Sequence, residues 1–164
     1  MLLLLAFFVS GSLLTSARGG GRQRNERQVL ANGGVAALAA LAGSWLAFAG
    51  SLAAATADTW ATEIGRHSRT PPRLITNGTP VPAGTDGGMT AFGTMGGFAG
   101  AALMGLLSGK FVIVSVAGAL GMLLDSLLGA TVQGRTRWLD NDTVNLAATV
   151  SGAGVAALAS RFCC

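Results

Sequence analysis

Residues 28–57 form a stretch of thirty residues without a single charged side chain, in a chain of 164 residues. Further apolar segments precede and follow it, and short clusters of arginine lie between them. An apolar segment of about 20 residues spans the hydrocarbon core of a bilayer, which is about 30 Å thick. Only 11% of the residues are charged, whereas a soluble domain has about 25%. The sequence therefore predicts an all-α fold, a multi-pass bundle of transmembrane helices.

The basic loops indicate how the longest apolar segment is divided. If residues 29–57 crossed the membrane once, the arginines of 18–28 and those that follow residue 65 would face opposite sides, against the positive-inside tendency. A break at Gly43–Ser44 removes this conflict, with a short or partly inserted helix before it. Residues 66–88 then form a cytoplasmic loop rich in glycine and proline. We expect one domain of about six helices, at 1–17, 29–42, 45–65, 89–109, 111–133 and 143–160.

The net charge of +4 comes from ten arginines and one lysine. No aromatic side chains interleave with the arginine clusters, so the clusters indicate membrane topology and anionic ligands, and not nucleic acid. Cys163 and Cys164 are adjacent and predict neither a disulfide framework nor a metal site, which leaves reversible lipid attachment as an alternative. Residues 1–17 lack a basic leader segment, which favours a first membrane helix over a signal peptide.

Carboxylates interrupt the apolar pattern in two of the expected helices. Drawn at 100° per residue, Asp58 and Glu63 share one broad polar face with Thr62. Asp125 lies on a face rich in glycine, and an Asp inside a membrane helix costs about 2.5–3.5 kcal/mol, which makes it a functional-site hypothesis. The alternatives are a solvated helix end for the first two residues and a structural pair with an arginine for Asp125.

Other polar residues are expected near the same, cytoplasmic membrane face. Asn32 lies near the cytoplasmic end of its helix, and Asp142 and Asn145 share one face of the last helix, although Asn141 or Asp142 can equally serve as a helix cap. Arginines and glycine-rich loops bind phosphate oxygens. The expected substrate and phosphate-binding residues are Arg73, Gly84, Thr85, Gly87, Gly88, Asn32, Asp142 and Asn145.

The carboxylates predict a magnesium site. Mg²⁺ prefers oxygen ligands and usually keeps waters and substrate phosphates in its coordination shell. We therefore expect Asp58 and Asp125 as Mg²⁺ ligands, with Glu63 as a further ligand or an orienting group in the catalytic set. No Walker or Rossmann glycine motif occurs, so a nucleotide would be held in another way.

Five motifs in order resemble the signatures of an integral membrane family long catalogued as a domain of unknown function: QVLANGG, ATADTWATEIG, PRLIT…VPAGTDGG, GMLLDSLLGATVQ and DNDTVNL. This family includes transmembrane protein 19 and the plant phytyl-phosphate kinase, and the resemblance covers residues 4–160. It implies a kinase that transfers a phosphoryl group from a nucleoside triphosphate, CTP or ATP, to an isoprenoid monophosphate such as phytyl phosphate. Because family members carry further apolar helices before the position of residue 1, this chain is expected to lack them.

Two functions of other classes are compatible with the same residues. An ion-coupled transporter also has intramembrane carboxylates and broken helices, but its site lies near the bilayer midplane between repeats, and no repeat is evident here. A non-catalytic membrane protein would tolerate Asn or Gln at the acidic positions. The expected partners are the lipid bilayer, an isoprenoid phosphate and a nucleoside triphosphate, without nucleic acid, and a homo-oligomer is left open.

Overall fold

The computed structural model describes residues 1–16, 26–159 and 161, without the side chains of 26–28. The side chains of the arginines at 18, 22, 24 and 27, which the sequence predicts on the cytoplasmic side, and the cysteine pair 163–164 lie outside the described residues. Two strands of two residues each pair antiparallel, and the remaining elements are helices, so the predicted helical bundle is confirmed. The helices are α1 Leu2–Ser16, α2 Glu26–Leu41, α3 Trp45–Gly65, α4 Ala91–Ser108, α5 Phe111–Thr131 and α6 Asn141–Ala159, and the strands are β1 Arg73–Leu74 and β2 Gly88–Met89.

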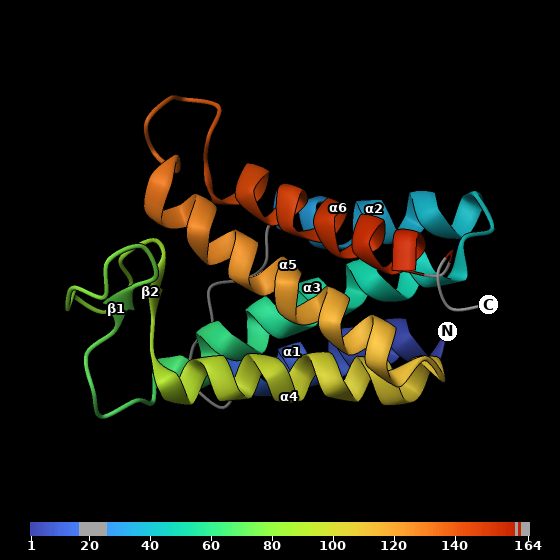
Figure 1. Ribbon diagram of the computed structural model, residues 1–164, viewed down its shortest axis with the longest axis horizontal. Coiled ribbons are helices and arrows are strands. Elements are labelled where there is room, and N and C mark those ends of the chain that lie inside the picture. Colours follow the sequence, from blue (N-terminus) through green and yellow to red (C-terminus); the bar gives the residue numbers. More distant parts are fainter. Residues whose placement is uncertain (17–25, 160, 162–164) are drawn as a thin grey trace.

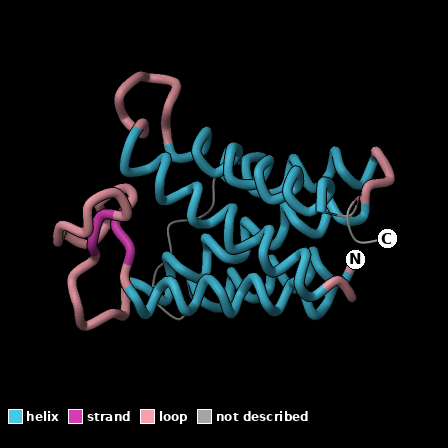
Figure 2. Tube along the Cα trace, viewed as in Figure 1, coloured by secondary structure: helices cyan, strands magenta, loops and turns pink. Residues whose placement is uncertain are grey.

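The helices run side by side along one long axis and alternate in direction (Figure 1). The start of α1 and the end of α6 lie at the same end of the bundle. Figure 2 shows the long segment between α3 and α4, with both strands, covering the opposite end. We call this the loop end, defined by residues 66–90 and 132–140.

The chain turns between α2 and α3 at Gly43. This glycine has φ +69°, the left-handed conformation that closes many helices. The N–H of Ser44 donates to the carbonyl of Ala39 at 2.9 Å, which satisfies an otherwise free carbonyl at the end of α2. The two helices can therefore return antiparallel, as the positions of the basic loops require.

Small residues pack the helices closely around α3, which contacts α1, α2, α4, α5 and α6. Gly50 of α3 and Gly152 of α6 face each other, and a Cβ added to Gly152 would lie 2.6 Å from the carbonyl oxygen of Gly50. A Cβ on Gly97 of α4 would lie 2.9 Å from the carbonyl oxygen of Ala57. Because apolar burial does not drive helix association in lipid, this close van der Waals contact is what holds such a bundle together.

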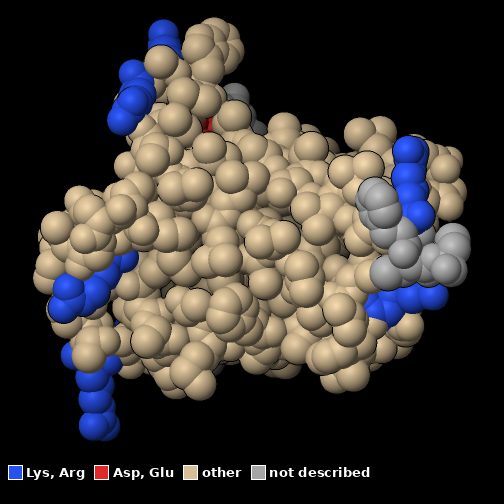
Figure 3. Space-filling model, viewed as in Figure 1, with Lys and Arg blue, Asp and Glu red and all other residues tan. Residues whose placement is uncertain are grey.

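The surface matches a membrane environment. Helices α4 and α5 are long and apolar enough to cross a bilayer, and α1 and residues 29–41 form shorter apolar helices. Large apolar side chains such as Met95, Val112 and Leu120 lie exposed on these helices. On the face drawn in Figure 3, the Lys and Arg side chains gather near the two ends and leave an uncharged belt between them. A belt of this kind is suited to lipid.

Candidate functional site

A cavity of about 610 Å³ opens at the loop end, between the end of α3, the loop, the start of α4 and the last turns of α5. We call it the loop cavity. One wall follows α3 and its continuation at intervals of three or four residues, the spacing of one helix face. The residues of that wall are Asp58, Ala61, Thr62, Gly65 and Arg66, and Arg69 lines the cavity from the bend that follows.

The polar faces of α3 and α5 meet in this cavity through Asp58 and Asp125. Both side chains are half-buried. The Oδ2 atom of Asp125 is fully buried and accepts no hydrogen bond from the described residues. Asp58 and Asp86 lie close enough to Asp125 for their negative charges to act on it. None of these three carboxylates forms an ion pair with a cation in 1–16, 26–159 or 161.

The loop is anchored to α5 at Gly87. Its φ of +72° belongs to the left-handed region, and a Cβ at this position would overlap Ala130 of α5. Gly129 is equally close, because a Cβ there would lie 2.9 Å from the nitrogen of Gly87. The carbonyl of Gly87 also accepts from the N–H of Ile75 at 3.2 Å. The loop is thus placed one helical turn from Asp125.

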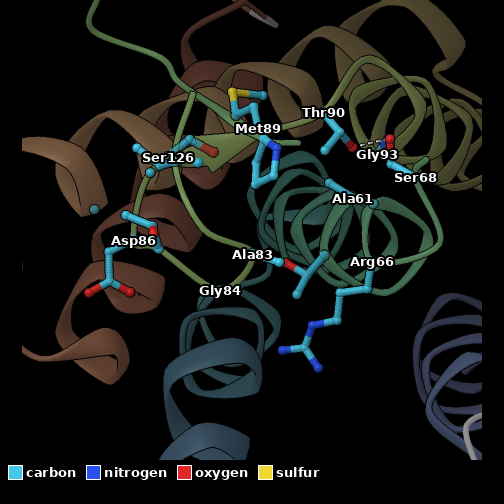
Figure 4. Close-up of a pocket in the computed structure, with 18 of the residues that line it drawn as sticks. Ala61, Arg66, Ser68, Ala83, Gly84, Asp86, Met89, Thr90, Gly93 and Ser126 are labelled. Atoms are coloured by element: carbon cyan, nitrogen blue, oxygen red, sulfur yellow. Dashed lines mark hydrogen bonds between the residues drawn. The ribbon is translucent and has the colours of Figure 1, made fainter. Parts of the chain in front are cut away.

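The cavity also carries cations and hydroxyl groups. Arg66 lines the cavity from the C-terminal cap of α3, and Arg69 and Thr85 line it from the loop that follows. Figure 4 shows Arg66, Asp86 and Ser126 around the cavity, contributed by three separate segments. Guanidinium and hydroxyl groups donate hydrogen bonds to phosphate oxygens. The rim of the cavity that carries these groups is therefore suited to an anionic ligand bound next to the carboxylates.

Six of the residues expected from the sequence line this cavity: Asp58, Asp125, Gly84, Thr85, Gly87 and Gly88. Two others lie nearby but outside it. Glu63 is half-buried on α3 and does not line the cavity. Arg73 is exposed in β1, and its Nη1 donates to the carbonyl of Gly78 at 2.8 Å. The structure therefore directs Arg73 to the hairpin and brings two other arginines to the cavity.

The remaining expected residues lie around α2 and α6. Asn145 is buried, with 8% of its surface exposed, and Asn32 is half-buried. Asp142 lines a second cavity of about 820 Å³, which it shares with Trp138 and Leu30. Neither the two asparagines nor Asp142 reaches the loop cavity.

The cap of α6 is Asp140, one residue before the positions considered from the sequence. Its Oδ1 accepts from the N–H of Thr143 at 3.0 Å and from the hydroxyl of the same residue at 3.0 Å. A carboxylate that satisfies an N–H of the first turn is an ordinary helix cap. Asn141 is therefore not needed as the cap, and it lines the loop cavity.

The donor set of the loop cavity fits Mg²⁺. Across the described ranges, no group of three or more His, Cys, Asp or Glu side chains is arranged to hold a metal ion. Mg²⁺ does not need one, because it is commonly held by one or two carboxylates with waters and substrate phosphates. The buried Oδ2 of Asp125, which has no hydrogen-bond donor among the described residues, and the carboxylate of Asp58 can supply those two ligands.

Further charged and polar residues that are not among the expected site residues also line the cavity, among them Arg66, Arg69, Asp86 and Ser126. In the sequence, the two arginines belong to a cluster that indicates membrane topology and anionic ligands. Arg66 also follows Asp58 and Thr62 at intervals of four residues, the spacing of one helical face, whereas Arg69 lies in a bend beyond the end of α3. Asp86 has no comparable local signal, because its position depends on the contact of Gly87 with α5.

Comparisons with known proteins agree with this architecture. An uncharacterized membrane protein of Methanocaldococcus jannaschii is 39% identical over 173 residues, covering 93% of this chain and 72% of the relative. One of Synechocystis is 34% identical over 184 residues, covering 94% and 71%. Protein PGR of Arabidopsis thaliana is 31% identical over 183 residues, covering 80% of this chain and 63% of its own length.

No solved structure matches the chain. The family model described as integral membrane protein DUF92 matches residues 1–153, almost the whole bundle including the loop cavity. The chain therefore belongs to the DUF92 family of integral membrane proteins.

Proposed function

We propose that this protein is a membrane lipid-phosphate kinase. It would transfer the terminal phosphoryl group of a nucleoside triphosphate, CTP or ATP, to an isoprenoid monophosphate such as phytyl phosphate, on the cytoplasmic side. The observation that carries the proposal is the meeting of Asp58 and Asp125 in one cavity, where neither forms an ion pair with a described residue, beside the arginines and loop residues of the rim. The resemblance of five sequence motifs to the family of the plant phytyl-phosphate kinase supports the same reaction.

Asp58 and Asp125 would hold Mg²⁺, which supplies positive charge to the nucleotide phosphates when it is bound. Arg66 and Arg69 would donate to the phosphate oxygens from the α3 wall. The hydroxyl of Thr85 lies on the loop side of the same cavity. Catalysis of phosphoryl transfer depends mostly on such positioning and electrostatic stabilisation. These groups are therefore of the types that the reaction requires.

The acceptor needs little activation. The second pKa of a phosphate monoester is about 6, so the acceptor is largely ionised near pH 7 and needs no strong general base. An oxygen of the acceptor phosphate forms a bond to the γ-phosphorus, and the bond from that phosphorus to the bridging β-oxygen breaks. The nucleoside diphosphate leaves with the electron pair. Ala61, Met89 and Gly93 supply an apolar side to the cavity, next to which the isoprenoid tail would lie.

The position of the cavity disfavours the transporter alternative. It lies at the loop end of the bundle, between the ends of α3 and α5 and the start of α4. A carrier site is expected near the midplane, between two related halves of the chain. A phosphoryl-transfer site benefits from the loop end, because a soluble nucleotide and a lipid phosphate both reach that depth.

The test is a turnover assay on the full chain in detergent. Wild-type protein is incubated with Mg²⁺, labelled CTP or ATP and a panel of prenyl monophosphates, and prenyl diphosphate is measured. Asp58→Asn and Asp125→Asn should each reduce turnover at least about 100-fold, the loss typical of removing one electrostatic group from an active site. Asp140→Asn is the matched control, because Asn also caps helices.

Two results would contradict the proposal. One is the absence of prenyl diphosphate with every acceptor and both nucleotides. The other is a folded Asp58→Asn protein with wild-type turnover, which would show that its carboxylate does not serve the reaction.

A further inference from the structure

Two side-chain amides of the loop cavity have no role in the scheme above. Gln133 follows the end of α5, and Asn141 begins α6, and both line the cavity. Neither amide is hydrogen-bonded to another residue in the described part of the chain. An amide offers one acceptor oxygen and two N–H donors, so each can bind a polar ligand.

The backbone brings these two amides to the same rim. Gly134, with φ +75°, ends the helical course of α5. Its N–H donates to the carbonyl of Leu139 at 2.7 Å, and the N–H of Leu139 donates to the carbonyl of Thr136 at 3.2 Å. These two bonds close residues 134–139 into a compact loop. The loop brings Gln133, just before it, near Asn141, which follows it.

The helix sets the distance between this rim and the carboxylates. Gly129 follows Asp125 by one turn on α5, and Gln133 lies two residues beyond Thr131, the last residue of that helix. The N–H of Gln133 donates to the carbonyl of Leu128 at 3.1 Å, which holds it in the last turn. The six residues from Asp125 to Thr131 rise about 9 Å along the helix at 1.5 Å each, and Gln133 lies beyond them. This is similar to the distance between the outer phosphates and the base of an extended nucleotide.

We propose that Gln133, assisted by Asn141, binds the base of the nucleoside triphosphate. The inference rests on the proposed function, which places the phosphates at the carboxylate end. The edge of cytosine carries an exocyclic amine beside a ring nitrogen acceptor, and one amide can bind both groups at once. Phosphate contacts do not distinguish nucleotides, so the choice among them depends on contacts at this rim.

The experiment measures binding and not turnover. Calorimetry in detergent with Mg²⁺ compares CTP, UTP and inorganic tripolyphosphate, which has the phosphates but no base. Gln133→Leu should weaken CTP about tenfold, the effect of losing one bidentate contact to a base. It should leave tripolyphosphate unchanged. Gln133→Glu should raise the preference for CTP over UTP, because a carboxylate accepts from the cytosine amine and repels the uracil carbonyl.

Thr136→Val is the matched control, since Thr136 lies in the same loop and does not line the cavity. It should bind all three ligands as the wild type does, and unfolding temperatures verify that the variants are folded. Wild-type CTP affinity in Gln133→Leu, or equal weakening of CTP and tripolyphosphate, would overturn the assignment of the base. A wild type that binds neither CTP nor tripolyphosphate would instead overturn the proposed function and the inference with it.

Discussion

Replacing Gly87 by alanine tests whether the contact with α5 holds the loop in place. Two costs arise at this position. The left-handed conformation, φ +72°, disfavours a residue with a Cβ by about 1–2 kcal/mol. The new Cβ also overlaps Ala130, and overpacking of this kind costs about 1–3 kcal/mol. The docked loop should therefore lose about 2–5 kcal/mol.

Gly78 provides the matched control. It has φ +70°, nearly the same as Gly87, but a Cβ there meets no atom within 4 Å. Gly78→Ala should cost only the conformational part, about 1–2 kcal/mol. The difference between the two variants then isolates the contact with α5, at about 1–3 kcal/mol.

Amide hydrogen exchange in detergent or lipid nanodiscs measures this difference. The N–H of Ile75, which donates to the carbonyl of Gly87, reports on the docked loop. Its exchange should be about 5- to 100-fold faster in Gly87→Ala than in Gly78→Ala, since 1.4 kcal/mol corresponds to a factor of ten. Equal exchange rates in the two variants would show that the contact of Gly87 with α5 does not anchor the loop.

Three further predictions concern packing, phosphate binding and topology. Gly152→Ala should lower the unfolding free energy by about 1–3 kcal/mol, because the new Cβ meets the Gly50 carbonyl. Gly154→Ala should raise it by about 0.5–1 kcal/mol, because a Cβ there meets no atom within 4 Å. Equal melting temperatures of the two variants would contradict this prediction. Arg66→Gln should weaken calorimetric binding of Mg²⁺-tripolyphosphate about tenfold or more, and Arg73→Gln should leave it unchanged because that side chain serves the hairpin. In a background without the native cysteines, single cysteines that replace Thr70 and Thr136 should react with an impermeant thiol reagent from the cytoplasmic side only. Labelling of the two positions from opposite sides would contradict the prediction that both loops lie on the same side of the membrane.

The features that the sequence predicts well are those encoded by neighbouring residues. The turn at Gly43 follows from the distribution of the arginines, and glycine is the residue best suited to the conformation found there. The polar face of α3 follows from helical periodicity alone, so the amino-acid sequence is sufficient to assign Asp58 to it. Such signals are local, and the packing of distant segments does not change them.

The features that the sequence does not predict depend on contacts between distant segments. The strands β1 and β2 have two residues each, which is too short for an alternating pattern to emerge. The position of Asp86 follows from the packing of Gly87 against Ala130, across more than forty residues of chain. In the sequence Arg73 lies nearer the glycine loop than Arg66 does and is the more natural candidate, but pairing of β1 with β2 fixes it in the exposed hairpin.

In the proposed site, the loop cavity holds a nucleoside triphosphate through a divalent cation on Asp58 and Asp125. Mn²⁺ can replace Mg²⁺ as a paramagnetic probe, and electron–nuclear double resonance (ENDOR) spectroscopy then detects phosphorus atoms close to the metal. Wild-type protein with Mn²⁺ and CTP should show a ³¹P hyperfine coupling, and Asp125→Asn should lose it while Asp140→Asn retains it. A ³¹P coupling of the same size and occupancy in Asp125→Asn would contradict the claim.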